Sequence, residues 1–192
     1  ETSWAKADMK HRLYAYYDGD RPSDQEEALT EYRLQYYIDW YFKDRVYLNG
    51  YAAAEADDKS GVDSRYKVGT GVGYRILQKD NHKLTVESGP SWLEEEYGAS
   101  FGGGSSDRLA MRWYLDWSCK FTNDISLFHN HEYLYSDSDN QRSQFKTRSG
   151  FHFPMGRGMY TELRHEYSYD SEPVDASLDE DSKITIGVGY NW

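Results

Sequence analysis

Histidines at alternate positions are the first residues in this sequence that could do chemistry. His129 and His131 stand in residues 125–135, which read ISLFHNHEYLY. On a β-strand the side chains at i and i+2 point the same way, and paired imidazoles are frequent zinc ligands. His165 is expected on the same face. A metal site, a contact with a partner protein or a second copy, and a polar patch without a role of its own all fit this pattern. We keep the three histidines as a candidate partner-contact patch.

Two sets of residues could contribute to hydrolysis. One is Ser126 with His129, and the other is His165 with Glu162 and Asp170. Such chemistry needs a nucleophile, a base within hydrogen-bond reach and a third group that orients the base. Neither set supplies all three clearly. We therefore expect no catalytic residues, no cofactor and no bound metal, and a hydrolase is only the third functional hypothesis.

Three alternating glycines, Gly69, Gly71 and Gly73, resemble a phosphate-binding loop only in spacing. No helical pattern follows them, so they do not indicate a nucleotide site. Within a strand they leave room for large side chains on neighbouring strands. The candidates for those side chains are Tyr37, Tyr51 and Arg112.

An alternation of apolar and polar residues predicts the elements that position all these groups. It recurs ten times, in segments near residues 9–17, 31–42, 46–52, 67–76, 84–92, 108–118, 125–135, 145–153, 159–167 and 183–192. The 19 tyrosines and six tryptophans also favour strands. No segment approaches the roughly 18 consecutive apolar residues of a transmembrane helix. The chain is predicted to be one all-β domain, residues 1–192.

Short and long connections alternate between these strands. The short ones are predicted near Lys43–Asp44, Gln78–His82, Thr122–Asp124 and Met155–Gly158, and the long ones near Asp18–Leu29, Ala56–Asp63, Glu95–Asp107, Ser136–Arg142 and Asp170–Asp181. Turns at one end and loops at the other are typical of a closed up-and-down antiparallel barrel in the bacterial outer membrane. We expect ten strands, with periplasmic turns and extracellular loops.

The polar face decides between a soluble barrel and a membrane barrel, because alternation alone fits both. That face carries charges of both signs together with tyrosines, which can satisfy one another inside a narrow lumen. The predicted lumen charge network consists of Arg12, Arg33, Asp39, Lys67, Arg75, Glu87, Arg112, Asp116, Glu132, Lys146, Arg148, Glu162 and Arg164.

Aromatic residues lie toward the ends of the apolar face, as in the girdles of membrane barrels. The predicted belt consists of Trp40, Trp92, Trp117, Tyr190 and Trp192. The apolar face is therefore expected to meet outer-membrane lipid. A soluble barrel that binds a ligand inside is the alternative.

The net charge of −11 is concentrated in the predicted long loops. This acidity argues against nucleic acid as a partner. Carboxylates at an external rim could bind divalent cations beside lipid phosphates, although solvated loops have the same composition.

Several segments resemble the family of salt-induced outer membrane proteins, a domain of unknown function in Gram-negative bacteria. The resemblance is carried by YKVGTGVGYRIL and KLTVESGPSW (66–77 and 83–92), by RLAMRWYLDWS and FTNDISL (108–118 and 121–127), and by LRHEYSYDSEPV and the C-terminal strand (163–174 and 184–192). It implies an outer-membrane barrel and assigns no catalytic residue. Members of that family usually carry another hairpin before the position of Trp4, and their terminal residue is more often Phe than Trp.

A ten-strand lumen is narrow enough for side chains to fill. The leading functional hypothesis is a structural or interaction barrel of the cell envelope, with a possible partner or oligomer contact on the outer face of residues 125–167. The alternative is a narrow channel for ions or small solutes, with a preference for anions.

Overall fold

A single antiparallel sheet makes up the fold. The computed structural model describes residues 2–6, 8–20, 29–58, 61–99, 102–121, 125–137, 141–173 and 179–190. Within these ranges it has eleven strands that pair in the order of the sequence, β1 to β11. Their bounds are β1 Thr2–Lys6, β2 Met9–Asp20, β3 Leu29–Tyr41, β4 Val46–Asp57, β5 Val62–Lys79, β6 His82–Tyr97, β7 Gly104–Lys120, β8 Ser126–Tyr135, β9 Ser143–Gly156, β10 Met159–Asp170 and β11 Glu180–Tyr190.

The ten strands predicted from the alternation correspond to β2–β11. A further strand, β1, pairs with Met9–Leu13 of β2. It contains only five residues, too few to show a period of two in the sequence. The described part of the chain contains no helix that is long and apolar enough to cross a membrane.

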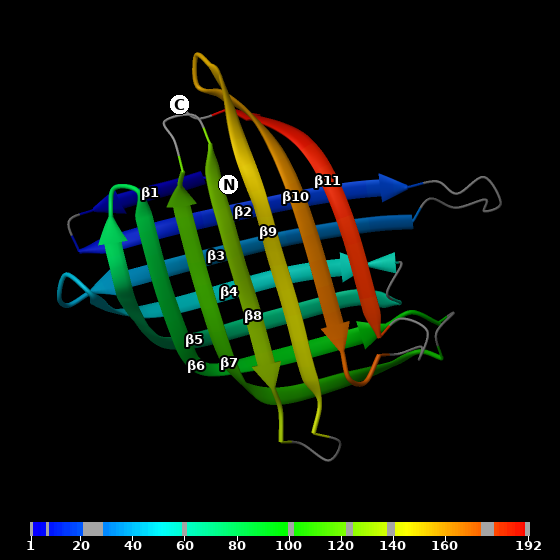
Figure 1. Cartoon of the computed structure of the whole chain (residues 1–192). Coiled ribbons are helices and arrows are strands. Elements are labelled where there is room, and N and C mark those ends of the chain that lie inside the picture. The colour runs from blue at the N-terminus through cyan, green and yellow to red at the C-terminus, as the bar shows by residue number, and fades with distance from the viewer. Residues whose placement is uncertain are drawn as a thin grey trace.

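The sheet is strongly curled, so that its last strands face its first (Figure 1). Side chains from strands far apart in the order meet on the concave side, which we call the interior. Lys146 of β9 lies 3.5 Å from Glu55 of β4. Lys183 of β11 donates to the hydroxyl of Tyr16 on β2 at 2.7 Å and pairs with Asp18. In the described residues the backbone pairing runs from β1 to β11, and β11 meets β2 through side chains.

Alternation places apolar side chains on the outer face and ionic side chains in the interior. Ile184, Ile186 and Val188 are 73%, 75% and 67% exposed, whereas Asp39 and Arg112 are each 2% exposed. This is the reverse of a water-soluble barrel, in which the apolar face forms the core. The expected orientation of the two faces is therefore confirmed.

Glycines in β5 accept aromatic side chains from β4 in the interior. A Cβ atom at Gly69 would overlap the ring of Tyr51, and one at Gly73 would overlap the ring of Tyr47. The predicted partner Tyr51 is thus confirmed for Gly69. Gly71 instead lies against the backbone of Ser88 and the side chain of Asn49.

The strands extend further toward the loop end than the sequence pattern indicates. β6 continues to Tyr97 and β5 begins at Val62, so the connection between β4 and β5 shrinks to residues 58–61. The outward residues there, such as Asp63, Glu94 and Glu96, are exposed and charged. The apolar alternation therefore stops before the backbone pairing does, and the predicted loops at Ala56–Asp63 and Glu95–Asp107 were too long.

Candidate functional site

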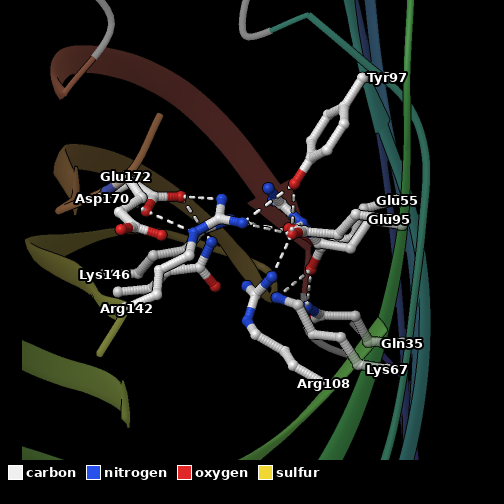
Figure 2. Close-up of polar contacts among 12 residues, drawn as sticks. Gln35, Glu55, Lys67, Glu95, Tyr97, Arg108, Arg142, Lys146, Asp170 and Glu172 are labelled. Atoms are coloured by element: carbon white, nitrogen blue, oxygen red, sulfur yellow. Dashed lines mark hydrogen bonds and ion pairs between the residues drawn. The ribbon is translucent and has the colours of Figure 1, made fainter. Parts of the chain in front are cut away.

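A buried carboxylate at the loop end of the interior gathers three arginines. Glu95 of β6 is 0% exposed and forms ion pairs with Arg65 of β5, Arg108 of β7 and Arg142, which precedes β9. The Arg142 contact measures 2.8 Å, and the hydroxyl of Tyr97 donates to Glu95 at 3.0 Å. Figure 2 shows Arg108, Arg142 and Tyr97 converging on the Glu95 carboxylate. Together with Arg65, these four residues form what we call the Glu95 cluster.

Arg142 connects this cluster to the end of β10. Its Nε and Nη2 donate to the two carboxylate oxygens of Asp170 at 2.8 and 2.5 Å (Figure 2). Gln144 donates to the same carboxylate at 2.6 Å. Burial disfavours the charged form of Asp170, but these hydrogen bonds outweigh burial and hold its pKa below the usual range. A bidentate arginine–carboxylate pair of this kind fixes geometry as well as charge.

Glu55 of β4 is the centre of a second ionic group. Its carboxylate lies 3.2 Å from Lys67, 3.6 Å from Arg65 and 3.5 Å from Lys146. Arg65 therefore joins this group to the Glu95 cluster. Because Lys146 reaches across from β9, the group holds the two sides of the curled sheet together.

A third ionic group lies nearer the turns. Arg12 of β2 pairs with Asp39 at 3.0 Å and approaches Glu87 at 3.6 Å. Glu87 also accepts from Arg112 at 3.0 Å and from the hydroxyl of Tyr47 at 2.7 Å. Arg112 in turn pairs with Glu132 of β8. We call this the Arg12–Glu87 group.

The other predicted network residues also belong to the interior face. Arg164 pairs with Glu162 at 3.1 Å, and Glu162 accepts a hydrogen bond from His152 at 2.7 Å. Arg75 lies over the Tyr41 ring, and Arg148 lies over the Tyr14 ring. Arg33 pairs with Glu31, and Asp116 lines the cavity nearest the turns. The structure thus brings the thirteen predicted residues onto one face, in several separate contact groups.

Three cavities follow one another along the interior. A cavity of about 350 Å³ at the loop end includes Arg65, Arg142 and Asp170 in its lining. A central cavity of about 170 Å³ shares Glu31, Arg33 and Lys146 with the first. A cavity of about 200 Å³ at the turn end includes Leu77 and Lys83 in its lining. The central and turn-end cavities share only Arg12 and Tyr114.

The candidate histidines lie in a polar row on the outer face. His129 of β8 pairs in register with Ser149 of β9, which pairs with His165 of β10. His129 makes hydrogen bonds to Ser149 at 2.7 Å and to His131 at 3.3 Å. His165 is bonded to Ser182 at 2.9 Å.

The two candidate hydrolytic sets do not assemble in the described residues. His165 is on the outer face, whereas Glu162 and Asp170 are on the interior face because they differ from it by an odd number of residues. His129 bonds to Ser149 and His131, and Ser126 lies at the start of β8 opposite His152. The described residues also contain no group of three His, Cys, Asp or Glu side chains that could hold a metal ion.

The predicted aromatic belt is partly described. Trp40 and Trp92 are exposed on the outer face, toward the turns and the loops respectively. Trp117 is half-buried against His82, with ring centroids 5.8 Å apart. The side chain of Tyr190 and all of Trp192 lie outside the described residues.

Sequence reasoning missed the residues that organise the loop end. Glu95 and Asp170 were assigned to acidic loops, yet they lie in β6 and β10. The available signal was parity, the odd or even residue number that decides which face of a strand a side chain points to. Glu95 continues the inward positions of Glu87 and Ser91 along β6. The placement of Arg142 carried no such signal, since it lies between strands.

A protein-family model matches residues 1–192 and is described as "Protein of unknown function, DUF481". The chain belongs to the DUF481 family. A comparison with curated protein sequences found no match. The family assignment agrees with the resemblance seen in the sequence in one respect, because both point to a family of unknown function.

Solved structures also match this DUF481 protein. One is a crystal structure of the NanC porin, at a TM-score of 0.56 and 9% sequence identity. The match covers 98% of this chain and 96% of the porin chain. At such low identity the likeness establishes a porin-like all-β fold.

Proposed function

We propose that this DUF481 protein is a β-barrel of the bacterial outer membrane with an interior filled by ion pairs, and that it serves as a structural or interaction component of the envelope. The observation that carries the proposal is the inverted burial of the two faces. Ile186 is 75% exposed while Glu95 is 0% exposed. A large exposed apolar surface marks contact with lipid or with another protein. Here it covers strand after strand around the curled sheet, as a lipid contact requires.

Closure of the barrel follows from the same proposal. An open sheet edge in hydrocarbon leaves backbone groups unsatisfied, at a cost of several kcal/mol each. In an antiparallel series β1 and β11 run in the same direction, whereas β2 and β11 run in opposite directions. We place the seam between β11 and the part of β2 beyond the stretch that pairs with β1 (Met9–Leu13), where Lys183 already reaches Tyr16 and Asp18.

Fluorescent labelling along β11 tests the membrane assignment. In a Cys119→Ser background, single cysteines at Ile184, Ile186 and Val188 would carry an environment-sensitive label, with Thr185 and Gly187 as inward controls. In vesicles the outward labels should be quenched by nitroxides on lipid chains and the inward labels should not. Outward labels that respond instead to a water-soluble quencher would exclude the membrane barrel.

A narrow ion pathway is the second candidate function, and the row of three cavities along the interior favours it. Charged side chains of both signs line all three cavities. A general porin is disfavoured because ionic groups cross the interior. Steady current through the wild-type protein in planar bilayers would support the pathway over the filled barrel.

A further inference from the structure

Of the three cavities described, the central one shares its lining unequally with its two neighbours. The loop-end and central cavities share several lining residues on β3, β9 and β11, so they adjoin broadly. The central and turn-end cavities meet only at Arg12 of β2 and Tyr114 of β7. We propose that Arg12 is the gate of an ion pathway through the barrel, closing it against Tyr114. This inference rests on the proposed membrane barrel and on its second candidate function, the narrow ion pathway.

Arg12 is positioned to block the passage. Its Nη2 is bonded to both oxygens of Asp39 on β3, at 3.0 and 3.2 Å, and lies 3.6 Å from Glu87 on β6. Since β6 is four strands away from β2 in the sheet order, the side chain spans the interior instead of lying along the wall. Its guanidinium is also 5.0 Å from the ring centroid of Tyr37.

The wall remains intact without Arg12. Glu87 keeps its contacts with Arg112 at 3.0 Å and with Tyr47 at 2.7 Å. Asp39 keeps the hydrogen bond that it accepts from the hydroxyl of Tyr41 at 3.4 Å. The gate is thus one flexible side chain held by two carboxylates, and neither carboxylate depends on it alone for a hydrogen bond.

Removing the guanidinium also changes the charge at the junction between the central and turn-end cavities. In the wild type a permeating ion meets a cation there. In Arg12→Ala it meets the carboxylates of Asp39 and Glu87, which attract cations and repel anions. The opened pathway should therefore conduct cations in preference to anions.

Single-channel recording in planar bilayers tests the gate. Arg12→Ala and Tyr114→Ala should each raise the unit conductance severalfold over the wild type, and Arg12→Ala should give a cation-selective reversal potential in a KCl gradient. Arg164→Ala is the matched control. Arg164 is as buried as Arg12, with side chains 12% and 15% exposed, and it pairs with Glu162 away from the constriction. Its removal should leave the conductance unchanged.

A double variant covers the chance that Arg12→Ala does not fold. Arg12→Ala/Asp39→Asn removes the exposed carboxylate with the guanidinium, and it should conduct with a weaker cation preference. Wild-type conductance in inserted Arg12→Ala and Tyr114→Ala would overturn the gate, as would an equal rise in Arg164→Ala. Failure of the wild type itself to insert into lipid would instead overturn the proposed membrane barrel.

Discussion

Tyr47 of β4 lies flat over the site of the missing side chain at Gly73 of β5, where a Cβ atom would overlap its ring. The two residues pair in register, and Tyr47 is 2% exposed. Its hydroxyl donates to Glu87 on β6 at 2.7 Å. The glycine is therefore what allows a tyrosine of β4 to reach the ionic groups of the interior across an intervening strand.

Gly73→Ala should destabilise the barrel, because the added methyl group displaces the Tyr47 ring and breaks its bond to Glu87. We expect a loss of about 1–3 kcal/mol, as for other overpacked sites. Urea denaturation of protein folded in detergent micelles measures the change. Gly187→Ala on β11 is the control, since a Cβ there meets nothing within 4 Å. Equal stability of the two variants would contradict this account of Gly73.

Glu95→Gln should weaken the loop end more than a surface substitution. It leaves the buried guanidinium groups of Arg65, Arg108 and Arg142 without their shared carboxylate. Breaking a buried ion pair by removing one partner costs about 3–5 kcal/mol. The readout is the same urea midpoint. The control is Glu94→Gln, one residue earlier and exposed on the outer side, which should change the urea midpoint little. A Glu95→Gln midpoint as high as that of Glu94→Gln would refute the structural role of the cluster.

The Arg142–Asp170 pair predicts a dependence of stability on pH. The pKa of Asp170 is lowered in the folded protein. The pair therefore contributes fully to the free energy of unfolding above the unfolded-state pKa of about 4. This contribution is lost as the pH falls from there through the folded-state pKa. Asp170→Asn should reduce the free energy of unfolding by about 2 kcal/mol at neutral pH. The difference between variant and wild type should vanish in acid. A difference that persists unchanged at low pH would contradict the assignment.

The polar row of His129, Ser149 and His165 predicts an association through the outer face. Polar side chains facing lipid cost free energy unless a partner covers them. The wild-type protein extracted in mild detergent should have the mass of a complex, and replacing His129, His131 and His165 by Leu should reduce that mass to that of the monomer. Replacing the outward Val68, Val72 and Leu109 by other aliphatic residues is the control. Unchanged mass in the triple-leucine variant would remove the row as a contact site.

The sequence was sufficient to predict β2–β11 because each strand repeats one rule, apolar outward and polar inward. The same rule failed beyond Trp92, where outward Glu94 and Glu96 ended the apolar pattern although Glu95 still points inward. The identity of ion-pair partners was not predictable either. Parity places Lys146 and Glu55 in the interior, but their meeting depends on how tightly the sheet curls. That curvature brings together residues 91 positions apart, and no local pattern encodes it.

The pairing of Lys146 with Glu55 constrains how such a chain can enter a bilayer. Arg12, Glu87 and Glu55 each have an opposite charge on a neighbouring strand, namely Asp39, Arg112 and Lys67. The ion pair of Lys146 instead joins β9 to β4, so a hairpin containing β9 that inserted alone would carry this ammonium group into hydrocarbon without that carboxylate. A sheet that bends into its rounded form at the membrane surface before it crosses has this counterion in place from the start.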